Sequence, residues 1–169
     1  MLRLNPETGA AHTTNPLVND PDVKKRSIVA DGLRNPFRAA WRPGSNELWV
    51  GDVGWIAWEE INRIVNPTAA VRNFGWPCYE GNDVGSGVQD GYAAVAPALT
   101  LCKNLYDAPG SVTAPFMSYF HAFELVPGEA CTMNMGSAVA GLAFHPLTGP
   151  YPQAYRGALF FTDYNRRCI

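Results

Sequence analysis

The residues best suited to contact a ligand are Arg34 and Asn35, which come directly before a proline. A residue that precedes proline is driven toward extended geometry, so both side chains can project from a loop. Arginine offers a planar fork of donors that suits carboxylate oxygens, and an asparagine amide both donates and accepts. The pair therefore predicts a polar ligand contact, with a purely structural tie between neighbouring elements as the alternative.

Two adjacent carboxylates, Glu59 and Glu60, lie within a predicted strand. Adjacent residues of a strand point to opposite faces, so these two cannot act together as a catalytic acid–base pair. We expect Glu59 to be solvated and Glu60 to be structural. His145 precedes Pro146 and so marks a loop, where a lone histidine is more often an ordinary turn residue than a ligand. Nothing in the sequence assigns a function to His12 or His121.

Charge and motif content exclude several function classes. The formal net charge is −2 and the pI is near 5.9, which gives no electrostatic reason to expect nucleic acid or an anionic membrane as partner. No run of about 18 apolar residues is present, and the N-terminus shows no signal peptide pattern. Nucleotide fingerprints, phosphate loops, serine-hydrolase elbows and zinc-protease motifs are also missing.

Four cysteines are widely spaced, without the Cys-x-x-Cys pairs of a zinc site. Two disulfides are the favoured interpretation, and they would indicate an oxidising compartment. Of the three possible pairings we favour Cys78 with Cys102 and Cys131 with Cys168, because each joins nearest neighbours in the sequence. Four buried free thiols remain the alternative.

Composition favours an all-β fold, since 16 glycines and 14 prolines accompany 12% aromatic residues. Residues 82–110 show no steady period and are expected to form a long loop insertion, pinned by Cys78 and Cys102. The strand candidates are short and bounded by Gly, Pro, Asn or Asp. They are residues 1–5, 27–30, 37–41, 47–51, 59–65, 116–120, 138–144 and 157–163.

Four sequence blocks between Gly32 and Gly81 occur in a distinctive order: GLRNPFR, ELWVGDVG, WEEINRI and NFGWPCYEG. They resemble the glucose/sorbosone dehydrogenase family, soluble sugar dehydrogenases that use pyrroloquinoline quinone and calcium on a six-bladed β-propeller. The resemblance implies that residues 1–169 form part of one such propeller, about two to three blades of four-stranded antiparallel sheet. Strands that look severed at both ends suggest a fragment of a longer chain.

The resemblance also assigns roles to particular residues. Arg34 and Asn35 would contact the quinone, and the main-chain carbonyls of Gly54 and Trp55 would hold the calcium that bridges to it. Glu60 occupies a position that helps to bind a second, structural calcium. By a looser alignment, three more basic residues fall near the cofactor: His145, Arg166 and Arg167.

The chain departs from the family pattern at two cofactor positions. Phe37 stands where the family has a glutamine, and Val53 stands where it has another polar residue. The base that takes the sugar proton in the family is a histidine on an earlier blade, and no residue here can be matched to it. The chain by itself is therefore expected to be inactive, with no catalytic residue of its own.

The resulting expectation is a fragment of a secreted or periplasmic sugar or aldose dehydrogenase, dependent on quinone and calcium. Its partners would be a small sugar substrate, an external electron acceptor and the remaining blades of the propeller. A rival from another class is a non-catalytic propeller binding module, similar to the hedgehog-interacting proteins, which the apolar Phe37 and Val53 favour. A second rival is a short disulfide-bonded β-domain without a ligand.

Overall fold

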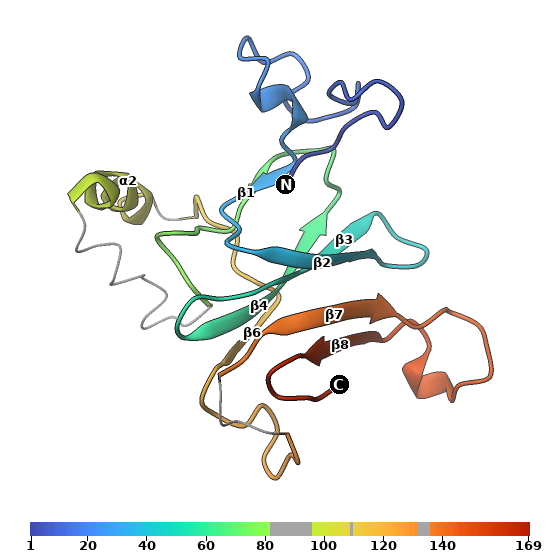
Figure 1. Cartoon of the computed structure of the whole chain (residues 1–169). Coiled ribbons are helices and arrows are strands. Elements are labelled where there is room, and N and C mark those ends of the chain that lie inside the picture. The colour runs from blue at the N-terminus through green and yellow to red at the C-terminus, as the bar shows by residue number, and fades with distance from the viewer. Residues whose placement is uncertain (82–95, 109, 132–135) are drawn as a thin grey trace.

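A computed structural model describes residues 1–81, 96–108, 110–131 and 136–169. Its central feature is a four-stranded antiparallel sheet in which the strands lie side by side in chain order (Figure 1). The strands of this sheet are β2 (Pro36–Trp41), β3 (Glu47–Asp52), β4 (Trp58–Val65) and β6 (Met117–Phe120). A sheet of four antiparallel strands that follow one another along the chain is the unit of a propeller blade.

A second sheet lies against the first and repeats its beginning. Strands β7 (Val139–Phe144) and β8 (Leu159–Asp163) form an antiparallel hairpin. The first residue of β7, Val139, bonds to Glu59 near the start of β4, and its last residue, Phe144, packs edge-on against Trp49 of β3 at 5.6 Å. Strand β7 therefore runs antiparallel to β3 and in the same direction as β2. The hairpin is therefore the beginning of a second blade.

The two hairpins, β2–β3 and β7–β8, each contain an irregularity in strand pairing. The pairing of β2 with β3 is shifted between Pro36 and Arg38, and the pairing of β7 with β8 is shifted between Val139 and Gly141. Each shift falls near the start of the first strand, which is where a bulge re-aims the chain. The two hairpins therefore share an early register shift as well as their antiparallel pairing.

Both faces of the four-stranded sheet are covered. Val50 and Ile64 pack with Ala30 and Phe74 on one face, at the parallel pair formed by β1 (Ala30–Asp31) and β5 (Arg72–Asn73). Because adjacent strand residues face opposite ways, Trp49 points to the other face, where it packs with Ile61 of β4 and Val139 of β7. The central strands β3 and β4 are accordingly buried on both sides, whereas β2 is mostly exposed.

The all-β prediction is confirmed in outline, with three local differences. Residues 1–5 form isolated bridges instead of a strand, from Leu2 to Ile28 and from Leu4 to Ala11. Residues 27–30 run from the end of a 3₁₀ turn, η1 (Lys25–Ser27), through the bridge residue Ile28 to Ala30, the first residue of the short β1. The described part of the expected loop at 82–110 contains a helix, α2 (Ala96–Tyr106), while residues 82–95 lie outside the described part of the chain. A further 3₁₀ turn, η2 (Gln153–Tyr155), lies between β7 and β8.

Both predicted disulfides are present. Cys78 bonds to Cys102, which attaches α2 to the loop after β5, and Cys131 bonds to Cys168, which ties the chain before β7 to the end of the chain. No cysteine is free. The nearest-neighbour pairing is therefore confirmed, and the alternative of four thiols is wrong for this structure. Among the described residues no helix is long and apolar enough to cross a membrane.

Candidate functional site

Arg34 and Asn35 lie in the loop that enters β2, where the carboxylate of Asp52 fixes the backbone. The backbone N–H of Arg34 donates to Asp52 Oδ2 at 2.9 Å, and that of Asn35 donates to Oδ1 at 2.6 Å. Asp52 is the last residue of β3, so the two bonds join neighbouring strands at the same end of the sheet. Gly32 starts the loop with φ +65°, and a side chain there would collide with Asn73. The Asn35 side chain is exposed.

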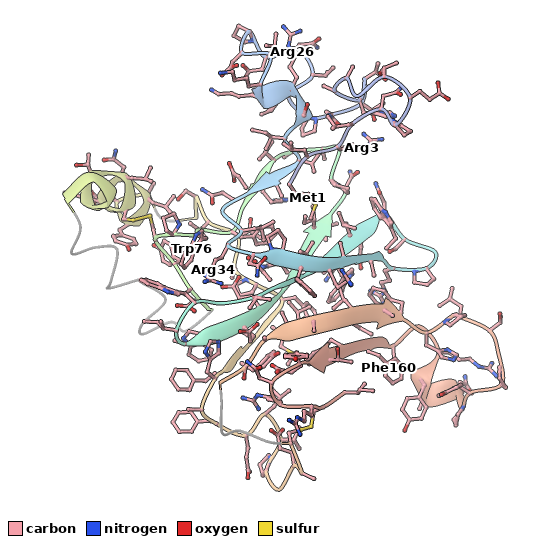
Figure 2. The ribbon with its side chains drawn as sticks, in the orientation of Figure 1. Met1, Arg3, Arg26, Arg34, Trp76 and Phe160 are labelled. Atoms are coloured by element: carbon pink, nitrogen blue, oxygen red, sulfur yellow. A yellow bond between two sulfur atoms is a disulfide. The ribbon has the colours of Figure 1, made fainter. Side chains whose placement is uncertain are left out.

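The guanidinium of Arg34 is held against the loop between β3 and β4. Its Nη1 donates to the carbonyl oxygen of Gly54 at 2.7 Å and to that of Val53 at 3.1 Å. The guanidinium carbon also lies 5.5 Å from the centre of the Trp76 ring, a cation–π arrangement, and Figure 2 shows the two side chains next to each other. Trp76 in turn meets Trp55 edge-on at 6.0 Å. Two other segments of the chain, one at residues 52–54 and one at Trp76, thus meet at Arg34.

The loop that carries these carbonyls is wrapped around the side chain of Glu80. Four consecutive backbone N–H groups, from Trp55 to Trp58, point at Glu80 Oε1 with distances between 2.6 and 3.2 Å. Such a nest of amides stabilises a buried anion. Gly54 has no room for a side chain, because a Cβ there would lie 1.5 Å from the carbonyl oxygen of Trp58. The backbone of this loop is therefore fixed before any ligand is considered.

Glu59 corrects an expectation from the sequence, because it is fully buried and not solvated. Its Oε1 receives the Gly54 N–H at 3.3 Å and lies 2.8 Å from His121 Nε2, while its Oε2 receives the N–H of Val139 at 2.8 Å. The single carboxylate joins β4 to the adjacent loop, to the residue after β6 and to the next sheet. It is buried because both faces of β4 are covered.

Two further carboxylates near this loop have raised pKa values. Burial raises the pKa of Asp52 to about 6, against the opposing effect of the two backbone N–H groups that it accepts. Burial also raises the pKa of Glu60 to about 7, although Asn62 and the Gly81 N–H donate to it. Asp52, Glu60 and Glu80 line one small cavity, and among the described residues that line it Arg34 is the only basic one.

The family model for glucose/sorbosone dehydrogenases matches residues 1–109, which is well over half of the chain. This chain belongs to the glucose/sorbosone dehydrogenase family. The matched region contains the whole cluster around Arg34, and the fold is accordingly part of a β-propeller. Searches of curated proteins and of solved structures found no match.

The family resemblance predicts a calcium ion at the main-chain carbonyl oxygens of Gly54 and Trp55. The arrangement around the Gly54 oxygen does not fit a calcium ion. The Gly54 oxygen already accepts from Arg34, and a guanidinium at hydrogen-bonding distance repels a divalent cation. Within the described ranges no group of three or more His, Cys, Asp or Glu side chains could hold a metal. The role of Glu60 at a second calcium stays a prediction.

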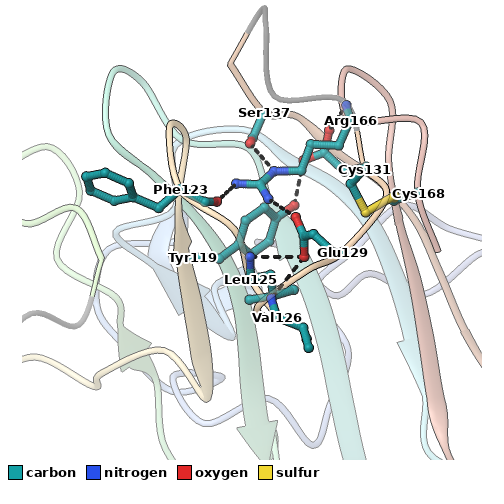
Figure 3. Close-up of a disulfide and its surroundings, with 10 residues drawn as sticks. Tyr119, Phe123, Leu125, Val126, Glu129, Cys131, Ser137, Arg166 and Cys168 are labelled. Atoms are coloured by element: carbon teal, nitrogen blue, oxygen red, sulfur yellow. Dashed lines mark hydrogen bonds and ion pairs between the residues drawn. A yellow bond between two sulfur atoms is a disulfide. The ribbon is translucent and has the colours of Figure 1, made fainter.

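Arg166 lies at the corresponding end of the second sheet, outside the part of the chain that the family model matches. Its side chain is 3% exposed and donates four hydrogen bonds, and Figure 3 shows Arg166 with the acceptors Ser137, Glu129 and Phe123. The acceptors are Ser137 Oγ at 2.7 Å, Glu129 Oε1 at 2.9 Å, and the carbonyl oxygens of Phe120 and Phe123 at 2.6 and 2.7 Å. Arg167 beside it is exposed, with φ +56°. A cofactor role for either residue stays a prediction.

His145 follows the far end of β7 and is not brought near Arg34. Its ring packs against Tyr151 at 4.7 Å, and its Nδ1 lies 2.8 Å from the carbonyl oxygen of Pro146. The following residue, Leu147, lies beside Gly44 in the turn between β2 and β3. Since Arg34 precedes β2 and this turn follows it, the sheet separates the two predicted contacts. The cofactor role of His145 remains untested.

Sequence reasoning missed three residues that organise this site: Asp52, Glu80 and His121. Asp52 ends a strand and Glu80 precedes a glycine, both inside the family blocks, so those blocks were the available signal. His121 had none. Its partner Glu59 is 62 residues away in the chain, and only the pairing of β4 with β6 brings them together.

Proposed function

We propose that this chain is part of a dehydrogenase that oxidises a sugar hydroxyl with pyrroloquinoline quinone, and that Arg34 and Asn35 are its contacts to the quinone. The observation that carries the proposal is the fixed geometry of this pair within the family region. Asp52 holds both backbone N–H groups, so the two side chains leave the sheet at a defined point. A binding site requires such preorganisation.

The side chains present fit an anionic planar ligand. Among the described residues only Nη1 of Arg34 makes a hydrogen bond, so Nε and Nη2 remain as donors for carboxylate or carbonyl oxygens. Asn35 adds an exposed amide, and the half-exposed Trp55 adds an aromatic surface. These groups bind and orient the ligand and leave acid–base catalysis to other residues.

The bound quinone supplies an acceptor for the hydride that leaves the sugar carbon, and an external electron acceptor then reoxidises it. The hydroxyl proton goes to a base, which the proposal places on a blade outside this chain. Arg34 contributes by fixing the ligand orientation. A neutral sugar substrate suits a chain whose formal net charge is only −2.

Further blades of a longer propeller are the proposed partners of β2. Phe37 and Trp41 on this strand are 49% and 54% exposed, and an adjoining blade would cover them. The two disulfides support a secreted or periplasmic location, because disulfides persist in oxidising compartments.

The proposal is tested by titrating the chain with pyrroloquinoline quinone while following tryptophan fluorescence. We expect saturable quenching in the wild-type chain. The affinity for the quinone should fall at least about tenfold in Asn35→Ala, because a hydrogen bond to a charged ligand group supplies a large share of the binding free energy. Arg38→Met is the matched control, because Arg38 is an exposed arginine that lies over its own neighbour Phe37. Equal binding by wild type and Asn35→Ala would reject the proposed contact.

A second candidate is a binding module of the same descent without catalysis. The exposed aromatic pair on β2, Phe37 and Trp41, favours it, because exposed aromatics are typical of protein-binding surfaces. The same titration separates the two functions. An absence of quinone binding in the folded wild-type chain would favour the module and reject the dehydrogenase.

A further inference from the structure

The carbonyl oxygens of Val53 and Gly54 point at one atom, Nη1 of Arg34. The distances are 3.1 and 2.7 Å, within the range of good hydrogen bonds to a charged donor. Main-chain carbonyl oxygens such as these two are also ligands that hard cations choose. The turn at these residues, which we term the carbonyl turn (Val53–Gly54), therefore already holds a positive charge supplied by the chain.

Arg34 is held in this position from two other directions. Its own backbone N–H donates to Asp52 at 2.9 Å, so the origin of the side chain is fixed. Its guanidinium stacks over Trp76 at 5.5 Å, and the cis Trp76–Pro77 segment is bonded back to Gly32 through the Trp76 N–H at 2.8 Å. The side chain is therefore held between the turn and an aromatic face.

The carboxylates nearby are committed to other donors. Asp52 accepts two backbone N–H groups, Glu60 accepts from Gly81 and Asn62, and Glu80 receives the four amides of the loop. Within the part of the chain that the structure describes, Arg34 is the only basic side chain that lines their common cavity. Its positive charge therefore offsets the negative charge of this region, a task that a bound divalent ion would otherwise perform.

We propose that Arg34 is the resident cation of the carbonyl turn and excludes a divalent ion from the Val53 and Gly54 oxygens. Guanidinium and calcium would compete for the same oxygen atoms, and each would repel the other at this distance. Calcium could bind at the turn only if Arg34 moved out of it. The inference concerns only this turn and stands whether or not the chain binds a quinone.

Terbium luminescence tests the proposal directly, because terbium occupies calcium sites and is sensitised by nearby tryptophans such as Trp55 and Trp76. We expect the wild-type chain to show no saturable, calcium-reversible signal at millimolar ion, the range of extracellular calcium modules. Arg34→Met removes the charge but keeps an apolar stem on Trp76. It should bind terbium and calcium at least about tenfold more tightly than wild type.

Two control variants separate charge at the turn from charge elsewhere. Arg34→Lys keeps a positive charge and should leave the turn closed to the ion, while Arg38→Met should behave as wild type because Arg38 is exposed beside Phe37. Calcium binding by wild type that Arg34→Met fails to strengthen would overturn the proposal.

A measurement on the wild-type chain decides the matter if Arg34→Met does not fold. The side-chain Nε–Hε resonance of Arg34 is followed by NMR during addition of millimolar calcium. We expect no saturable change in its position or exchange rate. A saturable shift of this resonance would mean that calcium displaces Arg34 and would overturn the exclusion.

Discussion

Two arginines occupy corresponding ends of neighbouring sheets and are used differently. At the first sheet, Asp52 at the end of β3 receives the N–H of Asn35 before β2. At the second, Asp163 at the end of β8 receives the N–H of Ala138 before β7 at 2.9 Å. Each aspartate thus joins the first two strands of its sheet, and an arginine donates to loop carbonyls beside it.

The two clusters differ in how completely the arginine is enclosed. Arg166 is 3% exposed, uses four of its N–H donors and lies over Tyr119, whose hydroxyl donates to Asp163 at 2.8 Å. Burial, followed by this hydrogen bond, raises the pKa of Tyr119 above its usual range. Arg34 is partly exposed and donates through one nitrogen. We infer that the Arg166 cluster stabilises the fold and that the Arg34 cluster is organised for binding.

Replacing Arg166 should cause the largest loss of stability. Arg166→Met would leave the Glu129 carboxylate, whose side chain is only 10% exposed, without its ion pair and two carbonyls without donors, at a cost of about 3–5 kcal/mol. Chemical denaturation of Arg166→Met beside Arg167→Met measures it, because the neighbouring Arg167 is exposed. Equal stabilities of the two variants would show that the Arg166 cluster is not a stabilising one.

Removing the disulfide at the same cluster should have the next largest effect. Cys131 and Cys168 close a loop of sequence separation 37, for which chain entropy predicts a loss of about 4 kcal/mol in Cys131→Ser/Cys168→Ser. The matched variant, Cys78→Ser/Cys102→Ser, opens a loop of separation 24 and releases α2 at the other cluster. Amide hydrogen exchange around Arg166 should become faster in Cys131→Ser/Cys168→Ser and not in Cys78→Ser/Cys102→Ser. An equal increase around Arg34 in Cys131→Ser/Cys168→Ser would contradict the separation of the two clusters.

The Arg34 region should be more stable at mildly acidic pH than at neutral pH. Glu60 keeps its proton up to about pH 7 in the folded protein, against 4.5 for the ordinary group, so the folded state binds more protons between these values. The free energy of unfolding should therefore fall, by about 2 kcal/mol from this group, as pH rises from 4.5 to 7.

Thermal unfolding of Glu60→Gln against pH checks this slope. The variant should lose most of the fall in the free energy of unfolding that Glu60 causes. It should keep the fall caused by Asp52, whose pKa is raised to about 6. Glu7→Gln changes an exposed carboxylate and serves as control. A slope in Glu60→Gln as steep as in wild type would show that Glu60 is not the group that titrates.

Replacing Arg34 should cost the least stability of these changes. Arg34→Met gives up two hydrogen bonds from a partly exposed side chain, and we expect a loss of about 1 kcal/mol in denaturant unfolding. A loss as large as that in Arg166→Met would mean that both arginines are structural and would remove the contrast.

The sequence predicted the strands of the first sheet well and predicted their burial poorly. Alternation along residues 59–65 implied one solvated face, whereas β4 is central and covered on both sides, so Glu59 and Glu60 are both buried. Likewise the helix at 96–106 was missed because its stretch shows no clear period, and its attachment depends on Cys102 and on Tyr106, which donates to the Cys78 carbonyl.

The candidate site was predictable only where its residues are close in sequence. Arg34 and Asn35 were found from their place before Pro36 and from the family blocks. Several bonds that define the site join residues 17 to 25 positions apart, as between Asn35 and Asp52 or between Trp55 and Glu80, and Glu59 meets His121 across 62 positions. Such contacts follow from sheet register and loop path, which composition and spacing do not specify.

The central claim is that the ligand-binding arginine is Arg34 and that the C-terminal arginines are not. Titration of pyrroloquinoline quinone into Arg34→Met and Arg167→Met, followed by tryptophan fluorescence, tests this most directly. We expect the affinity of Arg34→Met to fall at least about tenfold and that of Arg167→Met to match wild type. Wild-type affinity in Arg34→Met together with lost affinity in Arg167→Met would contradict the account and move the site to the second sheet.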